Sequence, residues 1–273
     1  MSSQFVGKCF CIITGGSSGF GQAIAQLMVK EKGLLSNAVA GSKILLLSRN
    51  IEGMEKTKAL ILEHGHSLDR FSIDFLSADL SNTAATETAV NNFLTNKQAG
   101  FDHFILFNNA GVLGNISGGA VTNPHPMQDY QKWFNVNMVS PIFLINRFCK
   151  HFSDAKCTVV QTSSFAAIQP SIYMSNYSPA KAGMDMFMQC LTLDHPEITT
   201  LSYSPGPMNT PMGVSLANNH GSQKVKDAWE DMRIKETDVK PLDSAQKLLN
   251  ILQNGEFKSG DFIDVMGRTK ASF

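Results

Sequence analysis

Short apolar runs alternate along the chain with longer segments of helical spacing. The apolar runs predict strands at residues 9–14, 43–47, 71–76, 103–107, 158–162, 199–203 and 262–266. Apolar positions three or four residues apart predict a helix that follows the glycine-rich turn after the first strand, and further helices over 52–63, 83–97, 128–151 and 178–193. Strands that alternate with helices form a parallel sheet covered on both faces. The pattern therefore predicts a doubly wound α/β domain with a mainly parallel seven-stranded sheet.

The C-terminal part of the pattern is less regular. Residues 205–221 are rich in Pro, Gly and Asn and lack periodicity, which predicts a long functional loop such as a lid, within a substrate loop of about 205–240. Val225, Trp229 and Met232 have helical spacing inside a charged segment, and Asp243 is predicted to cap a last helix. Because no repeat, low-complexity tract or linker interrupts the chain, residues 1–273 are predicted to form one domain.

Charge and composition exclude several classes of function. Lys plus Arg and Asp plus Glu both number 23, so no net charge favours nucleic acid or an anionic membrane as a partner. The longest apolar runs are too short to cross a bilayer, and the first residues lack the pattern of a signal peptide. The five cysteines and seven histidines show no metal-ligand spacing. We expect a cytoplasmic protein without a metal site or a membrane segment.

A glycine-rich segment follows the first predicted strand and opens the first helix. Glycines allow the backbone to turn sharply and to approach a pyrophosphate, and the helix N-terminus offers free N–H groups with partial positive charge. A glycine pattern is weak evidence by itself, but its position between a strand and a helix favours a nucleotide site. The segment comprises Thr14, Gly15, Gly16, Ser17, Ser18, Gly19, Phe20 and Gly21.

Tyr177 and Lys181 are four residues apart at the start of a predicted helix, so their side chains share one face. A free phenol has a pKa near ~10, and a neighbouring ammonium ion lowers it, which favours proton exchange with a substrate. Ser163 and Ser164 follow the fifth predicted strand, and a hydroxyl there can donate to a carbonyl oxygen as charge develops on it.

These motifs together resemble the short-chain dehydrogenase/reductase family. The spacing T-G-x-x-x-G-x-G, the N-N-A-G motif at 108–111, the segment 78–80, the Pro-Gly pair at 205–206 and Y-x-x-x-K occur in the family's order. The resemblance implies a Rossmann-type fold that binds a nicotinamide cofactor. It also implies a homodimer formed through the two long helices at 128–151 and 178–193. The cofactor contacts that it implies, beyond the glycine segment, are Ser48, Arg49, Asn50, Asp79, Leu80, Asn109, Ala110, Gly111, Tyr177, Lys181, Pro205, Gly206 and Thr210.

The same resemblance assigns the catalytic roles. The family spacing to Tyr177 selects Ser164, which polarises the substrate carbonyl, over Ser163. Lys181 tunes Tyr177 and holds the cofactor ribose. Asn137 matches the residue that holds a water linking the lysine to solvent, although an asparagine in a helix can also simply bond to nearby backbone.

The end of the second predicted strand indicates NADPH as the cofactor. A carboxylate there would bind a ribose 2′-hydroxyl, whereas this chain has Arg49 and no acid until Glu52. A guanidinium binds a phosphate through two hydrogen bonds, and Ser48 and Asn50 can add donors. The alternative is a solvated arginine at the helix start. Ser18 stands where many NADPH-dependent members carry a basic residue.

The chain resembles most the sepiapterin reductases, a branch of the family that reduces pterins. In that branch a C-terminal aspartate anchors the pterin, and its counterpart here is Asp264; an ordinary charge on an edge strand is the alternative. A carboxylate has two acceptors for the two-donor edge of a pterin. Leu113, Met208 and Tyr173 are candidates for the apolar walls of the site. The segments that carry this resemblance are 17–21, 113–117, 169–170, 204–210, 244–249 and 256–260.

The sequence therefore predicts NADPH-dependent reduction of carbonyl groups on a pterin side chain, the last step of tetrahydrobiopterin synthesis. Two alternatives remain: the same chemistry on a different ketone or diketone, and a regulatory protein that binds NADP without turnover. The set formed by Ser164, Tyr177, Lys181 and Asn137 argues against the second, because a binding module does not need all four.

Overall fold

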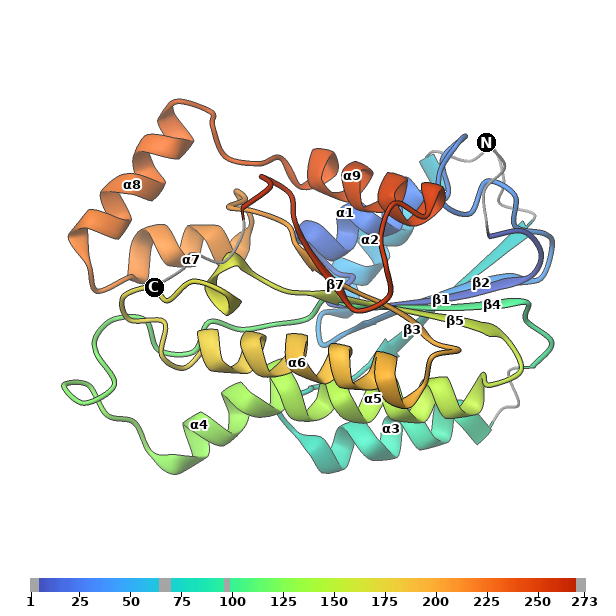
Figure 1. The fold of residues 1–273 in the computed structure, drawn as a ribbon, viewed down its shortest axis with the longest axis horizontal. Helices are drawn as coiled ribbons and strands as arrows, with labels where there is room; N and C mark the ends of the chain where they lie inside the picture. The colour runs from blue at the N-terminus through green and yellow to red at the C-terminus, as the bar shows by residue number, and fades with distance from the viewer. Residues whose placement is uncertain (1–4, 64–69, 96–98, 269–273) are drawn as a thin grey trace.

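Seven parallel strands form one twisted sheet with helices on both faces (Figure 1). The computed structural model describes residues 5–63, 70–95 and 99–268. The strands are β1 (Cys9–Thr14), β2 (Ser42–Ser48), β3 (Phe71–Ser77), β4 (His103–Asn108), β5 (Lys156–Thr162), β6 (Thr199–Ser204) and β7 (Asp261–Asp264). Their order is β3-β2-β1-β4-β5-β6-β7, and every neighbouring pair is parallel. The strand order reverses between β1 and β4, which is where such folds bind ligands.

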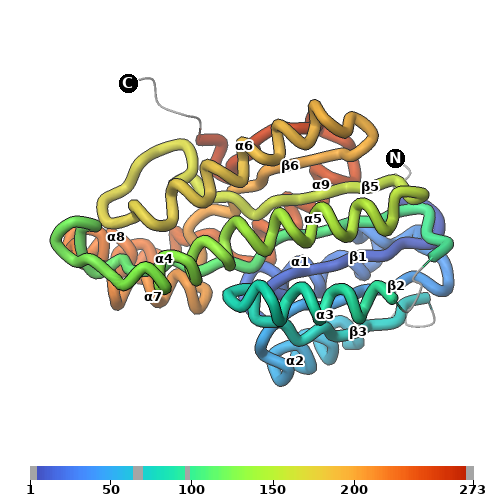
Figure 2. Tube along the Cα trace, turned by 90° about the horizontal axis from the view of Figure 1, so that it is seen from below, coloured from blue at the N-terminus to red at the C-terminus, as the bar shows by residue number. Residues whose placement is uncertain are grey.

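Two layers of helices cover the sheet. On one face lie α1 (Gly19–Met28), α2 (Ile51–Glu63) and α9 (Pro241–Asn254), and on the other lie α3 (Thr83–Thr95), α5 (Ser140–His151) and α6 (Ser178–Asp194) (Figures 1 and 2). Each layer packs on its own cluster of buried apolar side chains. The two ends of the described chain lie apart in both views (Figures 1 and 2).

Strand β1 shows why a central parallel strand must be apolar throughout. Cys11 and Ile13 enter the cluster beneath α1 and α9, while Phe10 and Ile12 enter the cluster beneath α5 and α6. All four side chains are fully buried because successive residues of a strand point to opposite faces and both faces are covered. Burial of such a side chain contributes roughly 1.5–3 kcal/mol.

The predicted strands and helices are present with small shifts at their ends. The strand predicted at 262–266 is β7, which ends at Asp264, and the helix predicted at 83–97 is α3, which ends at Thr95; residues 96 and 97 lie outside the described residues. The helix predicted at 128–151 consists of α4 (Met127–Phe134), a π-helical turn (Asn135–Val139) and α5.

The prediction of an aperiodic loop at 205–221 is wrong. The segment contains α7 (Pro211–Asn219), and α8 (Gln223–Ile234) follows it. Thr210 caps α7, since its hydroxyl accepts a hydrogen bond of 3.3 Å from the backbone N–H of Gly213, and Pro211 occupies the first turn, where a missing N–H is tolerated. Thr210 and Pro211 are helix-start signals in the sequence, but few strongly apolar positions follow them, so the periodicity did not indicate the helix. The last helix, α9, begins at Pro241, so Asp243 lies in its first turn instead of capping it.

Within the described residues, none of the helices has the length and apolar character needed to span a bilayer.

Candidate active site

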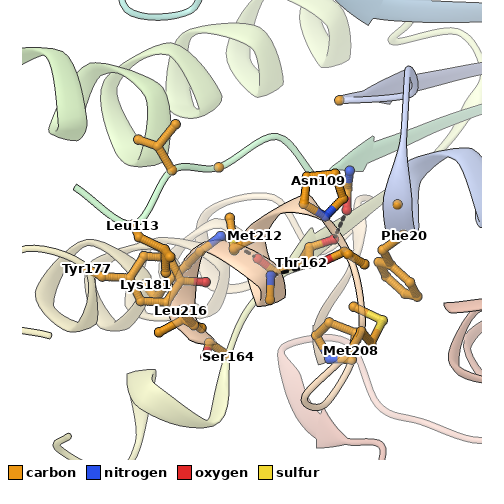
Figure 3. A pocket seen from close by; sticks show the side chains of 18 of the residues that line it. Phe20, Asn109, Leu113, Thr162, Ser164, Tyr177, Lys181, Met208, Met212 and Leu216 are labelled. Carbon is orange, nitrogen blue, oxygen red and sulfur yellow. Dashed lines mark hydrogen bonds between the residues drawn. The ribbon is translucent and has the colours of Figure 1, made fainter. Parts of the chain in front are cut away.

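A cavity of about 760 Å³ opens at the carboxyl ends of the strands. Its walls come from the turns that follow β1, β2, β3, β4, β5 and β6, from the start of α6 and from α7 and α8. Figure 3 shows the cavity, with Phe20 and Met208 toward one end and Tyr177, Leu113 and Leu216 toward the other. The cavity therefore spans the predicted cofactor and substrate residues.

The turn between β1 and α1 is shaped for close approach of a ligand. Gly15 and Gly19 have positive φ angles of 67° and 57°, which favour glycine. A Cβ on Gly21 would lie only 2.5 Å from the carbonyl oxygen of Gly15, so the close packing of the helix start against the turn requires glycine at this position. Ser18 starts α1 without a side-chain cap, which leaves N–H groups of the first turn open. The turn fits the pyrophosphate of a dinucleotide.

Thr14 ties this turn to the segment after β4. Its hydroxyl accepts hydrogen bonds from the backbone N–H groups of Asn109 (2.8 Å) and Ala110 (2.9 Å), and the Asn109 amide donates to the Thr14 carbonyl (3.0 Å). Asn109, Ala110 and Gly111 line the cavity, whereas Thr14 and Gly21 do not. Thr14 therefore supports this segment of the cavity wall through hydrogen bonds without lining the cavity itself.

The end of β2 presents an exposed guanidinium. Arg49 has a side chain 66% exposed, and its Nη1 lies 3.7 Å from a carboxylate oxygen of Asp79. Burial raises the pKa of Asp79, but hydrogen bonds from Ser81 and the Arg49 charge outweigh it and hold the pKa below its ordinary value. Ser48 lines the cavity next to Arg49. Asn50 does not line the cavity, and its side-chain oxygen accepts a hydrogen bond from the backbone N–H of Gly53 (2.9 Å) in α2.

Tyr177 and Lys181 lie side by side at the start of α6. The Lys181 ammonium donates to the carbonyl oxygen of Thr162 (2.7 Å) and lies 5.6 Å from the centre of the Tyr177 ring. Burial lowers the pKa of Lys181 to about 8. Burial also raises the pKa of Tyr177 to about 12, which a hydrogen bond with Ser164 partly offsets. The Asp185 charge adds to the effect of burial, so the pKa of Tyr177 is raised, opposite to the expected lowering, and the phenol keeps its proton at neutral pH.

The two neighbouring serines have different partners. Ser163 donates to a carboxylate oxygen of the buried Asp185 (2.6 Å). Ser164 caps a short 3-10 helix (Phe165–Ala167) and is the serine bonded to Tyr177. This pairing agrees with the assignment of Ser164 to the substrate carbonyl.

Asn137 lies in the π-helical turn between α4 and α5. Its amide accepts from the backbone N–H of Val112 (3.0 Å) and donates to the Val112 carbonyl (2.8 Å). A Cβ on Gly111 would lie 3.1 Å from the Asn137 oxygen and 3.5 Å from the Lys181 nitrogen, so both side chains approach the same backbone. Asn137 fixes the segment that follows β4 beside Lys181, and it does not itself line the cavity.

A family model described as short chain dehydrogenase matches residues 10–221. The chain belongs to the short-chain dehydrogenase family. Membership makes it an oxidoreductase that acts on the CH–OH/carbonyl couple, and the family's fold binds a nicotinamide cofactor.

Known relatives extend the match to nearly the whole chain. It is similar to a sepiapterin reductase of Xenopus laevis, with 33% identity over 95% of this chain and 96% of the relative. A benzil reductase ((S)-benzoin forming) of Bacillus subtilis is 26% identical over 93% of this chain and 97% of the relative. A solved structure of an NAD+-bound xylitol dehydrogenase superposes with a TM-score of 0.75 at 22% identity, covering 96% of this chain and 98% of that one, which shows the same fold.

Asp185 is a buried acid that contacts Ser163 and interacts with Lys181. It follows Lys181 by one helical turn, is 7% exposed, and raises the pKa of Lys181 while burial lowers it. Burial also raises the pKa of Asp185 itself, against the Ser163 hydrogen bond and the Lys181 charge. Sequence reasoning missed Asp185, although its four-residue spacing from Lys181 was a signal.

The substrate end of the cavity is mostly apolar. Leu113 lines this end, whereas Met208 lines the cavity at the other end, near Phe20 (Figure 3). Tyr173 does not line the cavity, and its ring lies against His220 with 5.7 Å between ring centres. Helices α7 and α8 add walls that sequence reasoning did not assign, namely Met212, Leu216, Val225, Trp229 and Met232. Leu113 and Tyr177 form one buried cluster against which Met212 and Leu216 pack (Figure 3).

Asp264, the predicted pterin anchor, lies outside the cavity lining. Its carboxylate is paired with Arg268, which does line the cavity. The structure therefore brings Ser164, Tyr177 and Lys181 together at the cavity and places Asp264 behind another side chain.

Proposed function

We propose that this chain reduces carbonyl groups on a pterin side chain with NADPH. The observation that carries the proposal is the buried Tyr177, protonated and hydrogen-bonded to Ser164, beside Lys181 at the wall of a cavity large enough for cofactor and substrate. The identity to the Xenopus laevis sepiapterin reductase over 95% of the chain supports the choice of a pterin.

Each side chain has a distinct part in the reaction. A nicotinamide cofactor would supply the hydride when bound. Tyr177 donates its phenol proton to the substrate oxygen as the carbonyl is reduced. Ser164 donates a hydrogen bond to that oxygen and stabilises the charge that develops there. The Lys181 charge favours the phenolate that remains on Tyr177, and Asn137 supports a path for its reprotonation from solvent.

The cofactor preference follows from Arg49. Its exposed guanidinium at the end of β2 can bind a 2′-phosphate through two hydrogen bonds, and Ser48 can add a donor. Asp79 lies 3.7 Å from Arg49 and orients it in the absence of a phosphate. Asp79 and Leu80 line the cavity where the adenine would bind, and Thr210 lines it beside Gly19 near the predicted nicotinamide amide.

A second candidate is reduction of a different ketone or diketone by the same residues. The pairing of Asp264 with Arg268 favours it, because that carboxylate already has two guanidinium donors and cannot also meet the two-donor edge of a pterin. The name of the Bacillus subtilis relative supports a diketone.

The test is a substrate panel with NADPH and with NADH. We expect oxidation of NADPH in the presence of sepiapterin, at lower KM than with simple ketones, and a weaker reaction with NADH. Turnover of ketones without turnover of sepiapterin would leave the second candidate, and binding of NADPH without any turnover would favour a regulatory protein.

We also propose a homodimer formed through the long α4–α5 segment and α6. Val139 and Met186 on these helices are 48% and 58% exposed in the isolated chain, and pairing would bury them. Sedimentation of the wild-type chain and of Met186→Glu would test this, with a shift toward monomer expected for the variant.

A further inference from the structure

The carboxylate of Asp264 is saturated by contacts within the chain. It accepts hydrogen bonds from the Ser204 hydroxyl (2.7 Å), the backbone N–H groups of Met266 (2.9 Å) and Arg268 (3.3 Å), and the Arg268 guanidinium through Nε (2.9 Å) and Nη2 (2.8 Å). The Asp264 side chain is 0% exposed, whereas that of Arg268 is 31% exposed. Seen from the cavity, the arginine lies in front of the aspartate.

Two contacts fix the guanidinium of Arg268 in one place. The bidentate pair with Asp264 sets its plane, and its central carbon lies 4.2 Å from the centre of the Phe165 ring, a cation–π contact. Phe165 directly follows Ser164 in sequence, and Phe165 and Arg268 both line the cavity. The third nitrogen of the guanidinium, Nη1, has no hydrogen-bond partner among the described residues. A charged donor therefore lines the same cavity as Ser164 and contacts the residue that follows Ser164 in sequence.

We propose that Arg268 is a specificity-determining residue that donates a hydrogen bond to a second acceptor oxygen next to the reacting carbonyl of the substrate. The proposal rests on the proposed carbonyl reduction and narrows its substrate class. The substrates are carbonyl compounds with an adjacent oxygen, such as vicinal diketones and acyl pterins whose side chain carries a second oxygen. Asp264 is then a positioning residue for Arg268.

The chemistry of the guanidinium selects an acceptor. Arginine has five N–H donors and no acceptor, so a substrate donor that faced it would be repelled. The surrounding walls from α7 and α8 are largely apolar, and a polar group left unpaired in such surroundings is costly. A site built to pair with a substrate oxygen therefore discriminates against an analogue that lacks the oxygen.

Direct binding of the substrate to Asp264 would predict the opposite effect of removing Arg268 on substrate binding. If a two-donor substrate edge displaced Arg268 to reach Asp264, the arginine would compete with the substrate, and its removal would improve binding. If Arg268 holds the substrate, its removal weakens binding. The sign of the change separates the two.

The experiment compares benzil, a vicinal diketone, with deoxybenzoin, which keeps the same skeleton but lacks one carbonyl oxygen. We expect Arg268→Ala to raise the KM of benzil about tenfold, the effect of losing one hydrogen bond to a charged group, and to leave deoxybenzoin unchanged. The KM of benzil for Arg268→Lys should lie between those for the wild-type chain and Arg268→Ala, because lysine keeps the charge but cannot form the two parallel hydrogen bonds of a guanidinium. The control is Arg233→Ala, which removes an exposed arginine of α8 paired with Glu230.

Equal effects on both ketones, or a lower KM for benzil or sepiapterin in Arg268→Ala, would overturn the proposal. Unchanged NADPH affinity and thermal unfolding would exclude a folding defect in the variants. If the wild-type chain reduces no carbonyl compound, the proposed function fails. The dissociation constant of benzil, measured by calorimetry on wild type and Arg268→Ala loaded with NADP+, then decides the role of Arg268 by the same comparison.

Discussion

The two ends of the cavity are built in different ways. At the end where we propose cofactor binding and catalysis, the residues that line the cavity follow directly after β1, β2, β4 and β5 or lie at the start of α6. At the other end, the walls come from α7, α8 and the segment after β7. There Arg268 lines the cavity, and its guanidinium pairs with Asp264, four residues earlier in the sequence. The first end is fixed by backbone geometry and the second by side-chain packing, so changes at the two ends should alter different kinetic quantities.

Tyr177→Phe should have the largest effect. It removes the general acid, so turnover should fall by roughly 10²-fold or more with every substrate, while NADPH binding is kept. Steady-state rates and a fluorescence titration of NADPH measure the two quantities. Wild-type-like turnover in the variant would remove Tyr177 from the mechanism.

Arg49→Ala should separate the two cofactors. We expect the binding of NADPH to weaken by about 1–3 kcal/mol, typical for hydrogen bonds to a charged group, and that of NADH to change little. The binding of both cofactors to wild type and variant provides the comparison. Equal losses would show that Arg49 does not contact the 2′-phosphate.

Asp185→Asn should move the pH profile of turnover. The pKa of Lys181 is about 8, so its charge is lost as pH rises through that value. Asp185 raises this pKa against the effect of burial; without its charge the pKa falls, and the descending limb of the profile moves to lower pH. At neutral pH, turnover should fall, because a smaller fraction of Lys181 then carries its charge.

The control for this change is Asp243→Asn, an exposed acid of α9. An unshifted limb in Asp185→Asn would show that the aspartate acts only on stability.

The sequence predicted the first end well and the second end poorly for a physical reason. Tyr177 and Lys181 share a helix face, and the segments at 14–21 and 108–111 each follow a strand, so spacing alone indicates where they lie. Arg268 was not predicted, because the position of its side chain depends on a contact with Phe165, about a hundred positions earlier in the sequence, and on the turn after β7. Resemblance predicted Asp264 as the pterin anchor, with an ordinary charge on an edge strand as the alternative, but resemblance does not reveal which side chain pairs with its carboxylate.

Thr210→Ala should have the smallest effect. It removes the side-chain cap of α7 and should destabilise the chain by about 1 kcal/mol, seen as a lower free energy of unfolding in urea. Because α7 carries Met212 and Leu216, KM for the substrate should rise slightly. Ser222→Ala is the matched control, since Ser222 precedes α8 without capping it through its side chain. Equal destabilisation by both changes would contradict the role of the cap.

The central claim is that a carbonyl-reducing site is joined to an end that selects substrates with a second oxygen. The most direct measurement is the ratio of kcat/KM for benzil to kcat/KM for deoxybenzoin, with NADPH and the wild-type chain. We predict a ratio well above one, because benzil carries an oxygen next to its reacting carbonyl and deoxybenzoin, on the same skeleton, does not. A ratio of one or below would contradict the account.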